Sequence, residues 1–419
     1  MSVRLDILDV GVRGDGIAEE GGKRYFVPFT LPGETVEAEP RERRGEGMTA
    51  ELLEVLAPSP HREPPPCTHF KVCGGCALQH WRHDAYSAWK SDLIARALAQ
   101  RGVEALGFEP PLACAPGERR RADVVLRREG RRVLAGFHER ASTRIVDVTT
   151  CVVARPAINA LLEPLRSGLG AILPDGAAAD AIINETDSGL DVLIWPHRRL
   201  TLSVEARETL VALAERADLA RLGWGDRASA EPIVVRRTPL LLFGEARVEP
   251  PPGAFLQATK RAELAMRAAV AAWTDRAAKL ADLFAGVGAL SLGQAGRLAL
   301  FENDRPAVAS VEAAARRPSG SQVTVAHRDL FRNPLGKAEL DAFDAVLLDP
   351  PRAGAAAQCA ELARSKVQRV VYASCDPATF ARDARTLQEG GYRLEKLRSI
   401  DQFLWSAHVE LIALLQRPP

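Results

Sequence analysis

The sequence predicts an α/β protein in three parts: a small N-terminal β-barrel, a mixed α+β central part, and a C-terminal parallel sheet with helices on both faces. Short strand-like runs between glycine turns fill the N-terminus, clustered cysteines follow, and apolar strands alternate with alanine-rich helices near the C-terminus. A chain of 419 residues is too long for one core. We place the three parts at residues 1–57, 58–240 and 241–419.

Composition and charge narrow the classes of protein that fit. The 55 basic and 54 acidic side chains give a net charge of +1, so any nucleic-acid surface must be a local patch. The N-terminus lacks the apolar core of a signal peptide, and no apolar run reaches the roughly 18 residues that span a bilayer. Seven cysteines, an odd number, favour metal ligation or catalysis over a disulfide framework. We therefore predict a soluble, cytoplasmic protein with no membrane partner, and nothing in the sequence demands more than a monomer.

The first 57 residues are predicted to form the barrel, because short strands separated by glycine-rich turns are typical of one. This segment holds twelve acidic and seven basic side chains, so its net negative charge does not favour binding to RNA. The expected strands are Arg4–Val10, Arg24–Thr30, Thr35–Glu39 and Met48–Leu56.

Three clustered cysteines follow a proline-rich linker at residues 58–66. Cys67, Cys73 and Cys76 lie within ten residues, and the glycines between them permit a tight loop around a metal. Cys151 can serve as a distant fourth ligand. Four thiolates suit either structural zinc or an iron–sulfur cluster, and the spacing does not decide between them. Two further cysteines are expected to be packing residues, Cys114 and Cys359.

The central part is expected to combine a helix at residues 84–101 with strands at 122–126, 133–138 and 190–196. A basic run flanks the first of these strands, and it consists of Arg119-Arg120-Arg121, Arg127, Arg128, Arg131 and Arg132. Arginines at this density can bind RNA phosphates, but solvated strand edges often have the same composition. The run is a candidate RNA surface.

The C-terminal part changes to the order strand, glycine turn, helix, strand. Short and mostly apolar strands between alanine-rich helices predict a parallel sheet that is buried on both faces. The expected parallel strands are Leu280–Phe284, Leu298–Glu302, Phe343–Leu348 and Val367–Ala373, and Tyr392–Asp401 with His408–Leu415 is expected to form a terminal β-pair.

A glycine turn and three acidic strand ends suggest a cofactor pocket. The segment Asp282–Gly288 places Gly286 and a second glycine directly after a strand, where the backbone can approach a ligand closely. Glu302, Asp329 and Asp349 stand at successive strand ends, although each alone could be an ordinary loop acid. A cationic sulfonium favours carboxylates, whereas a dinucleotide favours a longer glycine-rich cradle. We therefore predict S-adenosylmethionine as the cofactor.

The segment Ser374-Cys375-Asp376-Pro377 follows a strand-like run, about twenty residues after Asp349-Pro350-Pro351-Arg352. This pairing is similar to that of carbon methyltransferases with a covalent cysteine. Uracil becomes a nucleophile at carbon 5 when a thiolate adds to carbon 6, and a base must later remove the carbon 5 proton. Cys375 fits the first role and Glu410 the second. The alternatives are a buried packing cysteine and an ordinary acid at a strand start.

These motifs resemble the bacterial RNA uracil-5 methyltransferases, most closely the iron–sulfur-containing branch that modifies 23S ribosomal RNA and carries an N-terminal TRAM domain. The likeness runs nearly end to end. It rests on Leu31–Glu34, Cys67–His80, Gly136-Phe137, Cys151, Phe255–Gln257, Asp282–Gly288, Asp349–Gly354, Ser374–Thr379 and His408–Glu410.

The resemblance implies an OB-like TRAM barrel, a Rossmann-like class I methyltransferase domain, and an RNA substrate whose target base leaves its stack. It implies Cys375 as nucleophile and Glu410 as proton acceptor. The implied ligands of a 4Fe-4S cluster, structural or RNA-positioning, are Cys67, Cys73, Cys76 and Cys151. The implied contacts with S-adenosylmethionine are Gln257, Phe284, Gly286, Ala289, Glu302, Asp329 and Asp349.

Three residues depart from the family pattern. Ala289 and Thr259 stand where the family often has asparagine, and Asp376 replaces the usual asparagine after the nucleophile. Ala289 keeps only a backbone contact, so we expect weaker cofactor binding. Asp376 is expected to raise the pKa of the neighbouring thiol and to slow its attack.

Four other functions compete with methylation of a 23S ribosomal RNA uridine. A transfer RNA uridine-5 methyltransferase would use the same residues. An RNA cytosine-5 methyltransferase usually has its cysteine in the loop where this chain has Asp349-Pro350-Pro351. A base-nitrogen methyltransferase would need neither Cys375 nor Glu410. A noncatalytic RNA-binding iron–sulfur protein would keep the fold and lose activity through Ala289 and Asp376.

Overall fold

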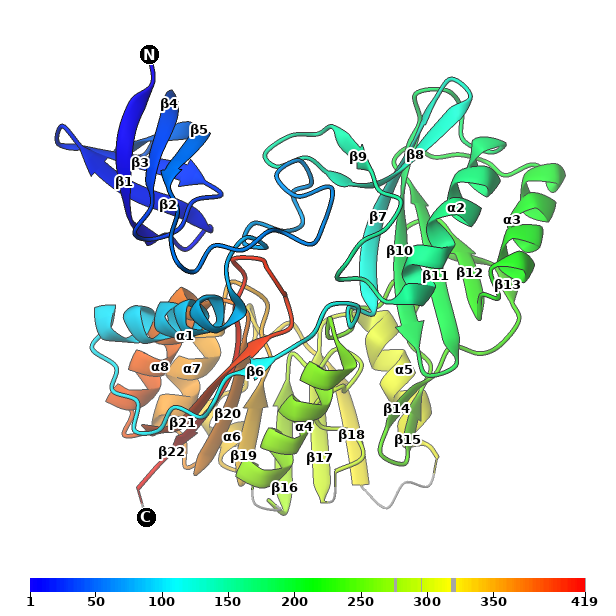
Figure 1. The fold of residues 1–419 in the computed structure, drawn as a ribbon. Helices are drawn as coiled ribbons and strands as arrows, with labels where there is room; N and C mark the ends of the chain where they lie inside the picture. Colours follow the sequence, from blue (N-terminus) through cyan, green and yellow to red (C-terminus); the bar gives the residue numbers. More distant parts are fainter. Residues whose placement is uncertain (275–276, 295, 318–321, 419) are drawn as a thin grey trace.

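The computed structural model describes residues 1–274, 277–294, 296–317 and 322–418. Figure 1 shows three bodies of structure: a barrel, a central sheet with two helices, and a larger C-terminal sheet with helices on both faces. This confirms the predicted α/β class. No helix in the described ranges is long and apolar enough to cross a membrane.

The N-terminal strands form a closed barrel in the order β1-β2-β3-β5-β4. Apolar side chains alternate with polar ones along the strands, so Leu5, Ile7 and Val36 fill the barrel interior. The predicted barrel is confirmed, but the second strand was not predicted because its polar sequence has the composition of a turn. The strands are β1 Val3–Val10, β2 Asp15–Glu20, β3 Lys23–Pro28, β4 Thr35–Arg44 and β5 Gly47–Ala57.

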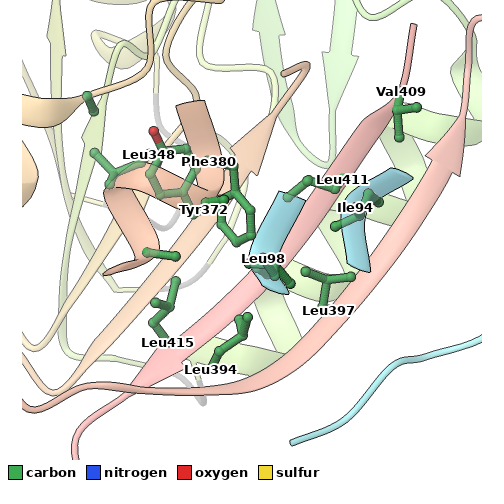
Figure 2. Packing of buried hydrophobic residues seen from close by; sticks show 14 of the residues in the cluster. Ile94, Leu98, Leu348, Tyr372, Phe380, Leu394, Leu397, Val409, Leu411 and Leu415 are labelled. Carbon is green, nitrogen blue, oxygen red and sulfur yellow. The ribbon is translucent and has the colours of Figure 1, made fainter. Parts of the chain in front are cut away.

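The first helix, α1 (His83–Gln100), leaves the cysteine segment and packs on the C-terminal sheet. Figure 2 shows Ile94 and Leu98 of α1 near Leu397 and Leu411, which lie on two C-terminal strands. The short strand β6 (Leu112–Ala113) then pairs in parallel with the edge of the same sheet. Residues of the range 58–240 therefore build part of the C-terminal body, and the domain division at residues 57 and 240 stays a prediction.

The central sheet has seven strands in the order β13-β12-β11-β10-β7-β8-β9. Two helices, α2 (Pro156–Gly170) and α3 (Val204–Arg216), share its apolar core. The strands are β7 Arg121–Glu129, β8 Arg132–His138, β9 Ile145–Asp147, β10 Ala178–Thr186, β11 Gly189–Pro196, β12 Arg221–Trp224 and β13 Glu231–Val235.

The C-terminal sheet has eight strands in the order β18-β17-β16-β19-β20-β22-β21-β6, and a small hairpin, β14 (Leu241–Phe243) with β15 (Ala246–Val248), precedes it. Neighbouring strands from β18 to β20 are parallel, and β22 lies antiparallel between β20 and β21. The strands are β16 Lys279–Leu283, β17 Arg297–Glu302, β18 Gln322–His327, β19 Ala345–Leu348, β20 Arg369–Ser374, β21 Arg393–Asp401 and β22 Glu410–Gln416.

Two separate apolar cores cover the two faces of this sheet. One core includes side chains of α1, α6, α7 and α8, and the other includes side chains of α4 and α5. Burial on both faces explains the nearly continuous apolar character of the strands. The helices are α4 Lys260–Thr274, α5 Arg305–Ala315, α6 Lys337–Leu340, α7 Ala356–Arg364 and α8 Pro377–Glu389.

Replacing Leu98 by alanine is expected to lower the unfolding free energy by about 2–5 kcal/mol, because it leaves a cavity between α1 and the sheet. Leu98 is 2 % exposed. The matched control is Leu264→Ala on α4, whose side chain is 55 % exposed and which should change stability by less than about 0.5 kcal/mol. Urea unfolding of both variants measures the difference, and equal effects would contradict the packing of α1 on the sheet.

Candidate active site

The C-terminal sheet forms a crevice at the carboxyl ends of its central strands. The strand order reverses between β16 and β19, and ligands of open α/β sheets bind at such switch points. Phe284 follows β16, Asp349 follows β19 and Cys375 follows β20. The sequence motifs therefore meet at one edge of the sheet.

Cys375 lies in the turn between β20 and α8. The next residue, Asp376, caps α8 because its carboxylate accepts hydrogen bonds from the backbone N–H groups of Ala378 and Thr379, both at 3.0 Å. Pro377 occupies the first helical turn, where its missing N–H costs nothing. The sequence Cys-Asp-Pro thus fixes the cysteine on a tight turn at a helix N-terminus.

Glu410 is brought opposite Cys375 by the pairing of β20 with β22. Ser374 pairs with Leu411 in the antiparallel register, and one further step along both strands sets Cys375 against Glu410. The Glu410 side chain is buried, with 4 % of its surface exposed. The expectation that the chain folds back to bring these two residues together is confirmed, although their catalytic roles stay predictions.

Three acidic groups share this buried region, and the pKa of each is raised. Burial raises the pKa of the Cys375 thiol to about 11, the charges of Glu410 and Asp349 add to the rise, and Arg352 opposes it. Burial and the charge of Asp349 raise the pKa of Glu410 to about 8. Burial and the charge of Glu302 raise the pKa of Asp349 to about 7.

Asp376 was expected to raise the pKa of the thiol, but the groups that act on Cys375 are Glu410, Asp349 and Arg352. The charge of Asp376 instead lies at the N-terminus of α8, where the helix dipole favours it. The structure therefore gives no support to slower attack through this substitution.

The glycine loop after β16 holds a carboxylate in place. Glu302 accepts a hydrogen bond from the Gly286 N–H at 2.8 Å and two more, each 2.7 Å, from Asn303 and Asp304. Gly286 has φ +55°, and Gly288 has φ +75° with so little space that a Cβ would lie 2.5 Å from a Leu292 methyl carbon. Both glycines are required by the backbone of this loop.

The remaining predicted cofactor residues lie around the same loop. The Gln257 amide donates to Asp349 at 3.3 Å. Asp329 accepts from the Phe331 N–H, and the Phe331 ring lies 5.3 Å from that of Phe284. Ala289, in the turn after the glycines, contributes its carbonyl to Arg267 at 2.6 Å, so this backbone oxygen is already engaged.

The carboxylates of the crevice suit a cationic ligand with hydroxyl groups. Within the described ranges no basic side chain forms an ion pair with Glu302, Asp349 or Glu410, although Glu410 is buried and Asp349 half-buried. Two raised carboxyl pKa values show that negative charge is unfavourable there, so a bound cation would relieve it. A sulfonium with an adenosyl group meets both requirements.

Sequence reasoning missed Gln402, which lies between β21 and β22. Its buried amide donates to Gln257 at 2.8 Å and to Glu410 at 2.9 Å, so it joins the cofactor side of the crevice to the buried acid. A polar residue directly after a strand and eight residues before Glu410 was the available signal.

The four predicted metal-ligand cysteines line one cavity of about 200 Å³ between the cysteine loop and the central sheet. They are Cys67, Cys73, Cys76 and Cys151. Tetrahedral zinc holds its thiolates about 4 Å apart. Within the described part of the chain, no three His, Cys, Asp or Glu side chains form a group that could hold a metal ion. The four cysteines therefore line one cavity, but their side chains in the described ranges do not form a metal-binding group.

Backbone contacts hold the cysteine loop between two bodies of the fold. The Gly74 N–H donates to the His138 carbonyl of the central sheet at 2.9 Å. The N–H groups of Ala77 and Leu78 donate to the Trp405 carbonyl at 2.9 and 3.0 Å, in the loop before Glu410. The packing cysteines Cys114 and Cys359 are buried elsewhere, as predicted.

Part of the predicted basic run is structural. Arg120 is 4 % exposed, forms a buried ion pair with Glu263, and donates to the Gln257 carbonyl at 3.1 Å. Arg128 donates to the Gly130 carbonyl at 2.9 Å and to the Leu173 carbonyl at 2.8 Å. The prediction of a phosphate contact is therefore wrong for Arg120, because its guanidinium is buried and paired.

Comparisons with known proteins identify relatives that align with nearly the whole chain. An uncharacterized RNA methyltransferase of Brucella suis is 43 % identical over 99 % of this chain and 98 % of its own length. The Halomonas elongata 23S rRNA (uracil(1939)-C(5))-methyltransferase RlmD is 33 % identical over 97 % of this chain and 87 % of its own. The family described as tRNA (Uracil-5-)-methyltransferase matches residues 319–418.

The chain belongs to the RNA (uracil-5-)-methyltransferase family. A solved structure of the Pyrococcus abyssi tRNA (uracil-54, C5)-methyltransferase with S-adenosyl-L-homocysteine covers 99 % of this chain and 100 % of its own, with TM-score 0.76 and 22 % identity. That likeness supports the fold. The prediction of an S-adenosylmethionine-dependent RNA methyltransferase is confirmed at this level.

Replacing Glu410 by glutamine in this methyltransferase is expected to speed alkylation of Cys375 by iodoacetamide several-fold at pH 9. Glu410 has a pKa of about 8 and is mostly ionised at pH 9, so the substitution removes a negative charge beside the thiol and lowers its pKa. Mass spectrometry of the Cys375 peptide measures the rate.

The matched control for this experiment is Asp376→Asn, which removes a charge of the same sign next to Cys375 but retains a side-chain acceptor for the helix cap. We expect it to change the alkylation rate by less than about twofold. A larger effect of Asp376→Asn than of Glu410→Gln would contradict the electrostatic assignment.

Proposed function

We propose that this chain methylates carbon 5 of a uridine in 23S ribosomal RNA, with Cys375 as nucleophile and Glu410 as proton acceptor. The observation that carries the proposal is the register of β20 and β22, which sets the buried Glu410 opposite Cys375 at the crevice of the sheet. A thiol and a carboxyl on opposite strands can act on adjacent atoms of one ring.

In the proposed reaction Cys375 adds to the uracil ring and later leaves it, and Glu410 removes one proton. The Cys375 thiolate bonds to carbon 6 of uracil, and electron density moves to carbon 5. Gln257, Glu302 and Asp349 would hold S-adenosylmethionine, which when bound would supply the methyl group for carbon 5 and leave as S-adenosylhomocysteine. Glu410 then takes the carbon 5 proton, the bond between sulfur and carbon 6 breaks, and the thiolate leaves.

The choice of 23S ribosomal RNA rests on the relatives. The Halomonas elongata protein is named for a uracil in 23S rRNA and aligns with nearly the whole chain. The matching family and the Pyrococcus abyssi structure are named for transfer RNA. Transfer RNA is therefore the second candidate substrate.

We further propose that the four cysteines hold a 4Fe-4S cluster and that the N-terminal barrel is a TRAM domain. The shared cavity of the four cysteines supports the cluster, since four thiolates are the usual ligands of a 4Fe-4S cluster. The closed five-stranded barrel supports an OB-like TRAM domain. The doubly wound C-terminal sheet supports the Rossmann-like class I assignment.

The proposal predicts that the wild-type protein transfers a labelled methyl group from S-adenosylmethionine to 5-methyluridine in RNA from cells that lack the protein. Cys375→Ala should transfer none, because the covalent adduct cannot form. Glu410→Gln should slow adduct release about a hundredfold or more and leave a protein–RNA complex stable to denaturant. Nucleoside digestion and denaturing gels measure these outcomes.

Fragment mapping of the labelled RNA separates ribosomal from transfer RNA. Label in 5-methylcytidine would identify a cytosine-5 methyltransferase, and normal turnover by Cys375→Ala would overturn the mechanism. If the protein binds S-adenosylmethionine but transfers no label to RNA, the noncatalytic RNA-binding alternative would be favoured.

The cluster proposal predicts a brown protein with about four iron atoms per chain after anaerobic purification. Cys151→Ala should lose most of this iron because it removes one thiolate from the cavity. Cys114→Ala is the matched control, since its thiol is buried outside that cavity, and it should keep the iron. A colourless protein with stoichiometric zinc would contradict the cluster.

A further inference from the structure

We propose that Gln402 is a positioning residue that holds Glu410 in its proton-accepting orientation and joins it to the cofactor side of the crevice. The inference rests on the proposed roles of Cys375 and Glu410. Gln402 follows β21 and its side chain is 2 % exposed, so its amide must find its hydrogen-bond partners inside the protein.

The backbone determines which way the Gln402 amide points. The Ala258 N–H donates to Gln402 Oε1 at 2.8 Å, and a backbone N–H cannot accept a hydrogen bond. The oxygen must therefore face Ala258, and the NH₂ group must face the crevice. A flipped amide would set two donors against each other.

The two donors of this NH₂ group have two side-chain acceptors. Gln402 Nε2 lies 2.8 Å from Gln257 Oε1 and 2.9 Å from Glu410 Oε2. Because Gln257 must present its oxygen here, its own NH₂ group turns toward Asp349, 3.3 Å away. One backbone N–H thus sets the direction of a hydrogen-bond series from Ala258 to Asp349.

This series acts directly on Glu410. The amide engages Oε2, and no donor in the described ranges is bonded to Oε1, which remains available to take a proton. The charged and titratable groups that face Glu410 are Asp349, at the end of β19, and Cys375, at the end of β20. The charge of Asp349 opposes the ionisation of Glu410, and the Gln402 amide favours the carboxylate.

A purely structural glutamine would have different partners. Gln358 is also buried, at 1 % exposed, but both ends of its amide bond the backbone of Leu335. Gln402 instead bonds two side chains of the site, one from the cofactor side and one from the acid. This difference makes Gln358 a matched control.

The test uses single turnovers of the full-length protein with RNA carrying tritium at uridine carbon 5 and S-adenosylmethionine with a ¹⁴C-methyl group. Methyl transfer to RNA reports addition of the methyl group, and tritium in water reports removal of the carbon 5 proton. For Gln402→Met we expect methyl transfer within about threefold of wild type and tritium release about tenfold slower at pH 7.

The pH dependence of tritium release identifies the cause. Without the amide donor the pKa of Glu410 rises, so the basic form appears at higher pH and the release profile should move up by about one pH unit. Gln402→Glu keeps the side-chain length and an acceptor for Ala258 but adds a nearby carboxyl, so its profile should move further in the same direction. Both variants should accumulate the covalent adduct.

Gln358→Met should lower stability but leave the release profile unchanged. Two controls must hold: wild-type protein methylates uridine, and both Gln402 variants bind S-adenosylhomocysteine. The inference is then overturned if the pH dependence of tritium release is the same in both variants as in wild type. If Gln402→Met does not fold, Gln402→Glu alone decides by the same criterion. A wild-type protein that places no methyl group on carbon 5 would instead overturn the proposed function, and the inference with it.

Discussion

The antiparallel pairing of β22 with β20 is the contact on which the candidate active site depends. Residues 411–415 of β22 are buried, so their apolar side chains drive this strand into the sheet between β20 and β21. The same insertion carries Glu410, the first residue of the strand, to a position opposite Cys375. Burial of the neighbouring leucines offsets the cost of placing a carboxyl group inside the protein.

The electrostatics of the crevice follow from this burial. Cys375, Glu410 and Asp349 each have a raised pKa, partly because each would ionise beside another acid. Their titrations are coupled, so the loss of one proton makes the loss of the next harder. A cation bound at the carboxyl ends of β16 and β19 would favour all three ionised forms. In the proposed mechanism, binding of the cationic cofactor would thereby favour the thiolate form of Cys375.

Features encoded in short segments could be predicted from the sequence, and features that depend on distant contacts could not. The pattern of apolar strands, each followed by a polar residue, correctly predicted that Glu302, Asp349 and Cys375 lie at one edge of the sheet. The reason is that parallel strands all run in the same direction. The cap formed by Asp376 and the network of Gln402 depend on partners that folding supplies. The packing of α1 on the C-terminal sheet, about 300 residues away in sequence, was likewise invisible.

The N-terminal half of the chain also contacts the loop that leads into β22 and Glu410. At its start, the carboxylate of Asp401 bonds Lys90 and Tyr86 of α1. In the middle of this loop, the Trp405 carbonyl accepts hydrogen bonds from two backbone N–H groups of the cysteine loop. Gln402 lies between these two anchors and Glu410 follows them, so displacement of either anchor would move the amide relative to the carboxyl group. The acid is therefore positioned jointly by the C-terminal sheet, α1 and the cysteine loop.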